Sequence, residues 1–171
     1  MTAVSKELHY TTFNTEMGWV AILASPQGLL AVTLPAESDE EARRMLGSRA
    51  DGAVRSPDWF ADSMERFRAY YSGREVIFPE NLDLSEATPF RRAVWEKTRL
   101  IPYGETRSYS WVARQIGKPE AARAVGQALG RNPLSIIVPC QRVVASDASL
   151  CGFAGGLEIK RRLLQLESRG S

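Results

Sequence analysis

A short segment near the C-terminal end of the chain, residues 132–144, restricts the local fold sharply. Its two β-branched apolar runs, Ile136–Val138 and Val143–Val144, predict two short buried strands. Pro139 follows the first run, and because proline has no N–H to donate, the first strand must end or bend there. The residue at this bend is Cys140, so the sequence predicts a thiol presented at the end of a buried strand.

Cys140 has two interpretations from its neighbours alone. With Arg142 two residues away, its thiolate would receive the electrostatic support that a catalytic nucleophile requires. Free cysteines are also common in protein cores as small, inert hydrophobic residues. The segment leaves both interpretations open, and the choice between them depends on the rest of the chain.

The composition is that of an ordinary soluble globular protein of one or two domains. The chain has 171 residues, of which 44% are hydrophobic and 25% charged. No apolar run approaches the roughly 20 residues of a membrane helix, and residues 1–7 lack the apolar core of a signal peptide. Two cysteines, Cys140 and Cys151, make no disulfide framework, and a single histidine, His9, makes no metal-ligand cluster. We therefore expect a cytoplasmic protein with no metal site and no membrane partner.

The net charge of +2 conceals an asymmetry between the two halves of the chain. Residues 1–87 carry 8 Lys and Arg against 14 Asp and Glu, a net charge of −6. Residues 88–171 carry 14 Lys and Arg against 6 Asp and Glu, a net charge of +8. A basic half joined to an acidic half is typical of a protein with one half bound to a polyanion such as nucleic acid, although charge also drifts between domains by chance.

Residues 1–84 predict a small α/β domain without visible chemistry. The turn residues Ser25-Pro26-Gln27-Gly28 separate two apolar runs, which indicates a hairpin. Ser38, followed by three acidic residues, and Ser56-Pro57 mark helix starts. The expected elements, in chain order, are strands at 19–24 and 29–34, helices from Ser38 to near Gly47 and from Pro57 to near Gly73, a strand at 76–78 and a linker at 79–86. The apolar stripe expected in the core of this domain is Phe60, Met64, Phe67 and Tyr71.

Residues 85–171 predict a second, mostly helical domain. The expected helices run from Thr88 to before Pro102, from Ser108 to Gly117, from Glu120 to Gly130 and from Leu157 to Glu167. The second and third of these are short and are joined by Gly117-Lys118-Pro119, the spacing of a helix-turn-helix. The predicted fold class is therefore α/β (α+β), with a domain boundary between residues 84 and 85.

The helix that begins at Glu120 has unusually small side chains. Large polar residues, which read base edges in the major groove, are missing from it. Its small residues permit close backbone approach, either to the protein core or to the narrow minor groove of DNA. In the second case, Arg123 is the single long side chain able to probe or replace a base.

Four motifs together resemble the O6-alkylguanine-DNA alkyltransferases (methylated-DNA–protein-cysteine methyltransferases). They are Ala-Ala-Arg123-Ala-Val-Gly, Asn132-Pro133, Pro139-Cys140-x-Arg142-Val143 and Phe153-x-Gly-Gly, in the family's order and spacing within residues 85–167. The resemblance implies an RNase H-like N-terminal domain and a C-terminal domain with a winged helix-turn-helix-like motif that enters the minor groove. It also implies an O6-alkylguanine flipped out of duplex DNA into a pocket beside the thiol.

The resemblance also assigns roles to individual residues. Cys140 corresponds to the alkyl-accepting nucleophile, Arg123 to the arginine that replaces the flipped nucleotide, and Tyr109 to the tyrosine that contacts the flipped base. The other catalytic positions implied are Asn132, which orders the active-site turn, Gln141, Lys160 near the pocket, and Glu167, the carboxylate of a Cys-His-Glu relay. The other DNA- or substrate-contacting positions implied are Ala121, Ala122, Ala124, Gly126, Arg142 and Phe153.

Two positions depart from the family's pattern. Phe153 lies where the family often has tyrosine, which removes one hydroxyl contact to the substrate oxygen. Gln141 lies where the family has the relay histidine, and an amide cannot hold a proton near neutral pH. Loss of a general base costs about 10²–10⁴-fold in rate, so transfer is expected to be slowed rather than abolished.

The sequence thus predicts a monomeric DNA repair protein that moves the alkyl group of O6-alkylguanine in duplex DNA onto Cys140, once per molecule and without a cofactor. An alkyltransferase-like protein, which binds the lesion without transfer, is one alternative, although that class lacks the nucleophile that is present here. A general helix-turn-helix module with a structural cysteine is another, but it leaves Arg123, Asn132 and Cys140 unexplained as a set. Cys151 is expected to be a small loop residue.

Overall fold

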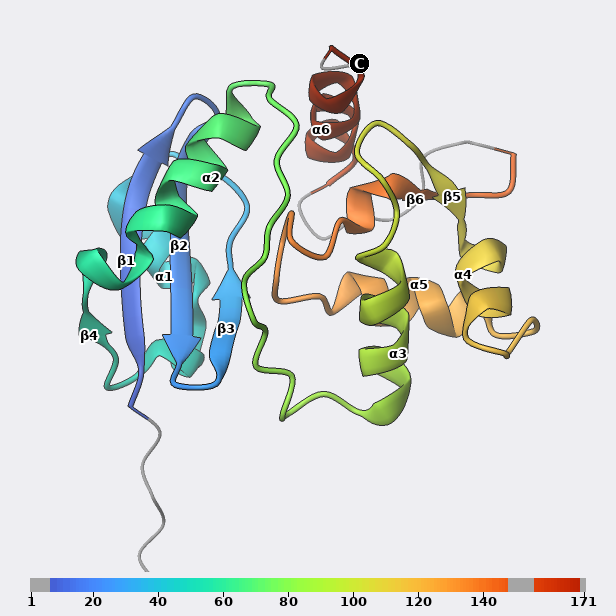
Figure 1. The fold of residues 1–171 in the computed structure, drawn as a ribbon, viewed down its shortest axis with the longest axis horizontal. Coiled ribbons are helices and arrows are strands. Elements are labelled where there is room, and N and C mark those ends of the chain that lie inside the picture. Colours follow the sequence, from blue (N-terminus) through green and yellow to red (C-terminus); the bar gives the residue numbers. More distant parts are fainter. Residues whose placement is uncertain (1–6, 148–155, 170–171) are drawn as a thin grey trace, which may run out of the picture. The chain divides into compact units, whose positions relative to one another are not determined.

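The computed structural model describes residues 7–147 and 156–169 (Figure 1). The chain divides into two compact units. The first contains residues up to Ser72 together with Val76–Ser85, and the second contains Gly73–Glu75 together with Glu86 onward. Among the described residues, no helix combines the length and the apolar character that a membrane span needs.

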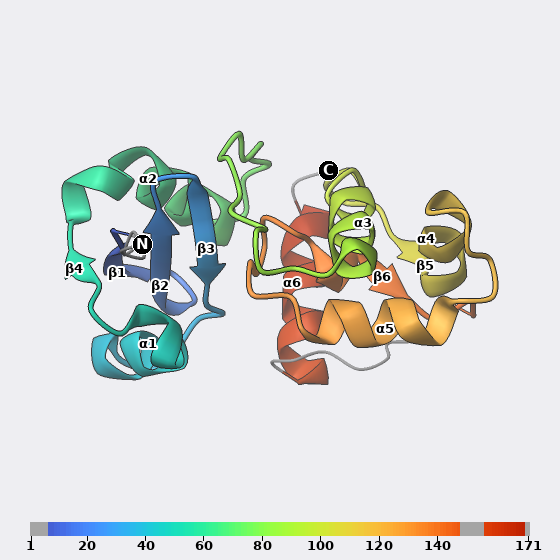
Figure 2. The same ribbon diagram turned by 90° about the horizontal axis from the view of Figure 1, so that it is seen from below.

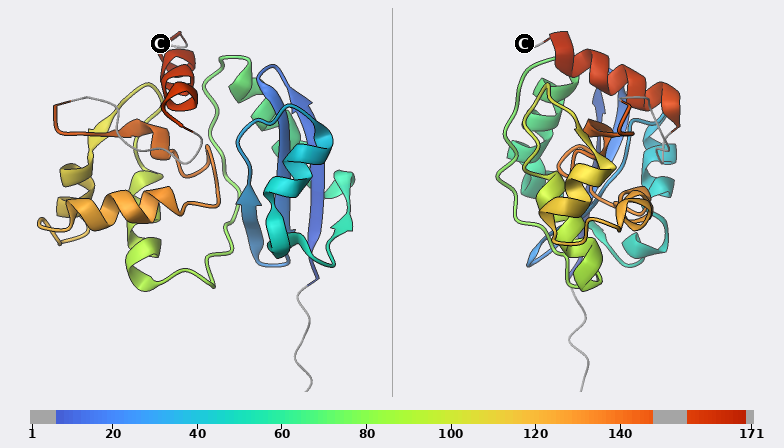
Figure 3. Two further views of the ribbon diagram at one scale, coloured as in Figure 1. Left: turned by 180° about the vertical axis from the view of Figure 1, so that it is seen from behind. Right: turned by 90° about the vertical axis from the view of Figure 1, so that its right-hand side faces the viewer.

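The first unit is a four-stranded sheet with a helix on each face (Figures 1 and 3). Its elements are β1 (His9–Thr15), β2 (Gly18–Ser25), β3 (Gly28–Val32), α1 (Asp39–Met45), the 3-10 helix Gly47–Ala50, β4 (Val54–Arg55), the 3-10 helix Pro57–Phe60 and α2 (Ala61–Tyr71). The strand order is β3-β2-β1-β4. Strand β2 pairs antiparallel with both β1 and β3, and β4 pairs parallel with β1. This is the small α/β domain that the sequence predicts.

Alternation along β1 gives the sheet two apolar faces. Tyr10 belongs to the core cluster that includes Ala42 of α1. Phe13, on the opposite face, packs against Phe67 of α2 with ring centroids 6.2 Å apart. Of the predicted apolar stripe, Met64 is half-buried and the other three members are buried. The stripe therefore has the core role expected of it.

The edge of this sheet differs from the prediction in two places. Residues 76–78, expected as a strand, have no strand pairing. The chain pairs with β3 farther along instead: the Leu29 N–H donates to the Asn81 carbonyl (2.9 Å), and the Asp83 N–H donates to the Leu29 carbonyl (2.8 Å). Residues 79–86, expected as a linker, therefore satisfy part of the exposed edge of β3. Inside the sheet, β1 is a further difference, because its Thr-rich sequence contains no apolar run and predicts no strand.

The second unit is mostly helical (Figure 2). Its elements are α3 (Pro89–Thr98), β5 (Arg107–Ser108), α4 (Tyr109–Gln115), α5 (Ala122–Gly130), the 3-10 helix Cys140–Arg142, β6 (Val143–Val144) and α6 (Leu157–Arg169). Thr88 and Ser108 cap α3 and α4: their Oγ atoms accept the N–H groups of Arg91 (3.2 Å) and Trp111 (2.9 Å). These are the predicted helix starts. A sheet-containing unit followed by a mostly helical unit is the predicted fold class.

The segment before the thiol is a turn rather than the predicted strand. Ser135 and Val138 form an isolated bridge within it rather than a strand pairing. The Val138 N–H donates to the Leu134 carbonyl (3.0 Å), a contact within the turn. Residues 136–138 are buried, so their apolar side chains fit a buried turn as well as a strand. The second predicted strand, Val143–Val144, does form as β6 and pairs in parallel with β5.

Candidate active site

Asn132 holds the turn that carries the thiol. Its Nδ2 donates to the Val138 carbonyl (2.9 Å) and lies 3.5 Å from Cys140 Sγ. Its Oδ1 accepts the Leu134 N–H (2.9 Å). One half-buried amide therefore ties together both ends of the turn and also touches the reactive atom.

Ile136, in the middle of this turn, has a strained backbone. Its φ is +76°, in the left-handed region, although it is a β-branched residue. Such a conformation costs about 1–3 kcal/mol and persists only where the surroundings enforce it. Burial of the Ile136 side chain and the hydrogen bonds of Asn132 enforce it here. The thiol is consequently attached to a turn with one well-defined conformation.

Cys140 is half-buried and begins a 3-10 helix of three residues. Burial raises the pKa of its thiol above the ordinary value. Several groups oppose this and lower the pKa: the hydrogen bond from Asn132, the charge of Lys160, and the backbone N–H groups of Cys140 and Gln141. The site thus holds a protonated thiol at neutral pH, with donors and a cation in place for its thiolate.

Lys160 supplies the positive charge near the thiol. Its side chain is fully buried, and Nζ donates to the Val143 carbonyl (2.7 Å). Nζ also lies 5.8 Å from the centre of the Tyr109 ring. The pairing of β5 with β6 explains this grouping, because Ser108, the residue before Tyr109, pairs with Val144. Residues from three separate elements therefore meet around one buried ammonium group.

Glu167, near the end of α6, is a buried acceptor at the centre of a second group. Its Oε2 accepts from Gln141 Nε2 (2.9 Å), and its Oε1 accepts from Arg142 Nε (2.7 Å). Arg142 Nη1 also donates to the Ile101 carbonyl (2.7 Å), and its guanidinium lies 5.6 Å from the Tyr103 ring centre. Glu167, Gln141 and Arg142 are all buried, so this group is a desolvated ion pair with an amide as its third member.

Arg142 does not have the position that the sequence predicts for it. Only 8% of the residue is exposed, and its guanidinium points to Glu167 and Ile101 rather than to the thiol or to solvent. The physical reason is that Glu167, 25 residues later, buries a carboxylate that requires a countercharge. The electrostatic support expected from Arg142 comes from Lys160 instead.

Glu167→Gln should lower the free energy of unfolding by about 1.5–3 kcal/mol, because the buried Arg142 guanidinium loses its charged acceptor. Denaturant titration followed by circular dichroism measures this loss. Glu158→Gln is the matched control, since Glu158 pairs with Arg161 on the exposed face of the same helix (2.8 Å) and exposed pairs contribute little. Equal losses for the two variants would contradict a stabilising role for the buried pair.

Helix α5 presents the residues expected to meet DNA. It packs through Val125, Ala128 and Leu129, which are buried. Arg123 is exposed, and within residues 7–147 and 156–169 its side chain makes no ion pair. The small residues Ala121, Ala122 and Ala124 are half-buried. The core therefore covers one face of the helix and leaves Arg123 and its small neighbours accessible.

Gly126 faces the ring of Tyr109. A β-carbon at this position would lie 3.6 Å from the nearest atom of the Tyr109 ring, an ordinary van der Waals contact. The ring of Tyr109 is thus placed between α5 and the ammonium group of Lys160. This arrangement links the expected DNA-contacting helix to the surroundings of the thiol.

Two of the predicted positions and three further groups complete the account of the site. Phe153 and Cys151 lie outside the described residues. Tyr103 and the carbonyl groups of Ile101 and Val143 take part in the site without having been predicted. Backbone acceptors leave no signal in a sequence, and Tyr103 has no distinctive spacing from the thiol. In the described parts of the chain, no group of three or more His, Cys, Asp or Glu residues could hold a metal ion.

Comparisons with known proteins agree over both units. The family "6-O-methylguanine DNA methyltransferase, DNA binding domain" matches residues 89–169, and "6-O-methylguanine DNA methyltransferase, ribonuclease-like domain" matches residues 8–84. A methylated-DNA–protein-cysteine methyltransferase of Mycolicibacterium paratuberculosis is 39% identical over 96% of this chain and 94% of its own. Its counterpart in Methanosarcina barkeri is 46% identical over 94% of this chain and 97% of its own. The crystal structure of Mycobacterium tuberculosis OGT in complex with DNA has a TM-score of 0.81, with 38% identity over 95% of this chain and 94% of that one.

Proposed function

The chain belongs to the 6-O-methylguanine DNA methyltransferase family, and we propose that it repairs O6-alkylguanine in duplex DNA by moving the alkyl group onto Cys140. The environment of the thiol carries this proposal. Asn132 Nδ2 lies 3.5 Å from Sγ, and the buried charge of Lys160 favours the thiolate. A cysteine with a purely structural role has no need of either group.

The proposed reaction is a displacement at the alkyl carbon. The Cys140 thiol loses its proton, and the thiolate attacks in line with the bond between the alkyl carbon and O6. A sulfur–carbon bond forms as the carbon–oxygen bond breaks. The electron pair of the broken bond stays with the base, which gains a proton and becomes ordinary guanine. The thioether product resists hydrolysis by acid–base side chains, so each molecule acts once and needs no cofactor.

Recognition of DNA is assigned to the second unit. Helix α5 would approach the minor groove through its small residues, and Arg123 would occupy the space of the flipped nucleotide. Tyr109, whose ring lies near Gly126 and Lys160, would contact the flipped base or its phosphate. The protein is proposed to do this as a monomer.

A lesion-binding protein without transfer is a second candidate. One observation favours it: the side chain that donates to Glu167 is Gln141, not a histidine (2.9 Å). An amide cannot accept the thiol proton. Cys140 and Lys160 nevertheless provide a nucleophile and a countercharge without any relay, and for this reason transfer is placed first.

Intact-protein and peptide mass spectrometry decides between the two candidates. The protein is mixed with excess duplex that carries one O6-methylguanine and is sampled over time, with an unmodified duplex as the control. Transfer predicts one methyl group on the peptide that contains Cys140, saturating at one per molecule. A protein that binds the lesion duplex more tightly than the control, yet gains no methyl group, would be assigned to the second candidate.

The rate of transfer should increase with pH. Burial raises the pKa of the Cys140 thiol, so only a small fraction is thiolate near neutral pH. As long as the pH is below that pKa, each increase of one pH unit makes the attacking thiolate about tenfold more abundant. The transfer rate therefore rises as the pH is raised. Single-turnover rates between about pH 6.5 and 8.5 measure this slope. Lys160→Met should move the profile to higher pH, because it removes a charge that stabilises the thiolate, and a profile without slope would contradict rate control by thiol ionisation.

A further inference from the structure

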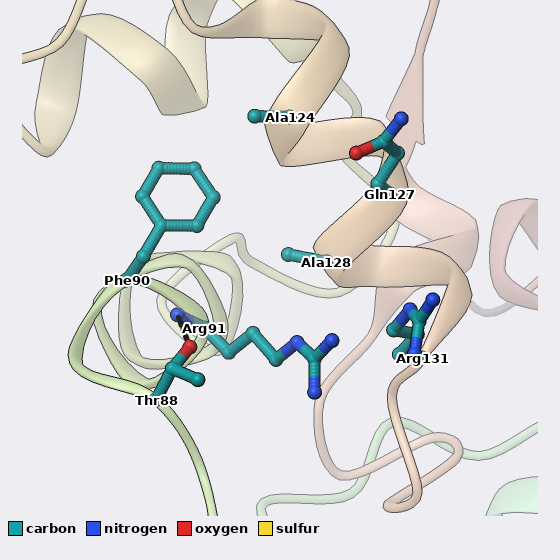
Figure 4. A pocket seen from close by; sticks show the side chains of 7 residues that line it. All are labelled: Thr88, Phe90, Arg91, Ala124, Gln127, Ala128 and Arg131. Atoms are coloured by element: carbon teal, nitrogen blue, oxygen red, sulfur yellow. Dashed lines mark hydrogen bonds between the residues drawn. The ribbon is translucent and has the colours of Figure 1, made fainter.

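The second unit contains a cavity of about 250 Å³ between the start of α3 and the side of α5 (Figure 4). Thr88, the cap of α3, and Phe90 and Arg91 of α3 line one side, and Ala124, Gln127 and Arg131 line it from α5 and its end. Arg91 extends across the cavity toward Arg131 in Figure 4. Two long cationic side chains from separate elements therefore converge on one hollow.

The charges of Arg91 and Arg131 are not neutralised by the protein. Within residues 7–147 and 156–169, neither side chain makes an ion pair or a hydrogen bond, and no carboxylate lines the cavity. Arg66 and Arg142, in contrast, are paired with the carboxylates of Glu80 (2.6 Å) and Glu167 (2.7 Å). Two like charges that face each other disfavour the folded state unless an anion lies between them. An anion between the two guanidinium groups would relieve this repulsion.

We propose that this cavity binds one backbone phosphate of the DNA strand that lies along α5. The proposal rests on the DNA partner of the proposed function. Planar guanidinium groups match the oxygens of a phosphate in geometry as well as in charge. The hydroxyl oxygen of Thr88 accepts a hydrogen bond from the backbone N–H of Arg91, so the hydrogen of this hydroxyl is available for a phosphate oxygen. Gln127, which is exposed, offers an amide donor from the opposite side.

The position of the cavity on α5 fits a strand contact near the lesion. Ala124 lines the cavity and is adjacent to Arg123, the residue assigned to the space of the flipped nucleotide. Arg131 lies eight residues beyond Arg123, about 12 Å along the helix axis. DNA rises about 3.4 Å per nucleotide of each strand. The contacted phosphate is therefore expected within about four nucleotides of the lesion.

The first test is the salt dependence of DNA binding by the double variant Arg91→Gln/Arg131→Gln. Loss of one phosphate contact should reduce the slope of log affinity against log salt concentration by about 0.9. Affinity should fall by the same factor for lesion and plain duplex, because a phosphate carries no base information. Arg44→Gln/Arg49→Gln is the matched control: it removes the same charge from exposed positions of the first unit. An unchanged slope in the double variant, or an equal change in the control, would overturn the proposal.

The second test locates the phosphate. Neutral methylphosphonate groups replace single phosphates within about four nucleotides of the lesion on each strand. At one methylphosphonate position, the wild-type protein should bind the DNA more weakly while the affinity of the double variant is unchanged. At every other position, the two proteins should lose affinity to the same extent. If both proteins respond alike at every replacement, the cavity does not contact the strand.

Inorganic phosphate distinguishes a strand contact from a site for the free ion. The melting temperatures of both proteins are measured with and without inorganic phosphate at constant ionic strength. If phosphate raises the melting temperature of the wild type alone, and the double variant keeps the wild-type salt dependence of DNA affinity, the cavity binds free phosphate and the strand contact is overturned. The double variant should melt no lower than the wild type, because the substitutions relieve repulsion. These experiments measure binding alone, so a protein that transfers no methyl group would give the same results. Normal methyl transfer, combined with an unchanged salt dependence of DNA affinity in the double variant, would overturn only the phosphate site.

Discussion

Cys140→Ala is expected to transfer no methyl group while it binds the lesion duplex with close to wild-type affinity. The thiol supplies the attacking atom, and its sulfur lies 3.5 Å from the Asn132 amide. The turn should keep its shape, because Asn132 still donates to Val138 (2.9 Å) and accepts from Leu134 (2.9 Å). The proposed DNA contacts on α5, at Tyr109 and in the cavity between α3 and α5 lie outside the turn. Peptide mass spectrometry measures transfer, and fluorescence anisotropy with lesion and plain duplexes measures binding.

Cys151→Ala is the matched control for this experiment, since it removes the only other thiol of the chain. This variant should become methylated at the wild-type rate. Methylation of Cys140→Ala on another residue would remove Cys140 as the acceptor. Loss of lesion binding in Cys140→Ala, with the fold intact, would show that the thiol is part of the recognition surface as well.

The sequence predicts the helical part of the site more accurately than the turn beside the thiol. Caps such as Ser108 act within three residues, so they can be recognised locally, and the structure has them. Residues 136–138 have the apolar, β-branched composition of a strand, but this composition predicts only that they are buried and does not fix their backbone conformation. The side chain of Asn132 binds the backbone groups that a neighbouring strand would otherwise pair. A polar side chain that takes the place of a strand cannot be recognised from periodicity.

The charged groups nearest to the thiol along the sequence are not the ones that act on it in the structure. Arg142 is two residues from the thiol, yet it serves Glu167, while Lys160, 20 residues away, acts on the thiol. Both outcomes follow from the position of α6, which brings Glu167 and Lys160 into the second unit seven residues apart on one helix. Seven residues are about two helical turns, so the two groups lie on the same side of α6. One helix thus supplies the cation for the thiol and the anion for Arg142.

Gln141→His is expected to accelerate methyl transfer by about 10²–10⁴-fold, the usual contribution of a general base. Gln141 is buried and its Nε2 donates to Glu167 Oε2 (2.9 Å), so an imidazole at this position would donate one ring N–H to the same oxygen. That hydrogen bond fixes the tautomer and leaves the other ring nitrogen free to take the thiol proton through a water molecule. Glu167 would also stabilise the resulting imidazolium. Single-turnover kinetics on the lesion duplex measure the gain.

The same variant should lose the pH dependence of the wild type above about pH 7, because a neutral imidazole then takes the proton as the thiol reacts. Gln141→Met is the control for shape, since it fills the site without a proton acceptor and should not accelerate transfer. Gln141→His combined with Glu167→Gln should lose most of the gain, because the ring is no longer oriented by a carboxylate. An unchanged rate in Gln141→His, with the variant folded, would mean that Lys160 and the backbone N–H groups already make thiol ionisation sufficient. In that case Gln141 has only a structural role, as a hydrogen-bond donor to Glu167.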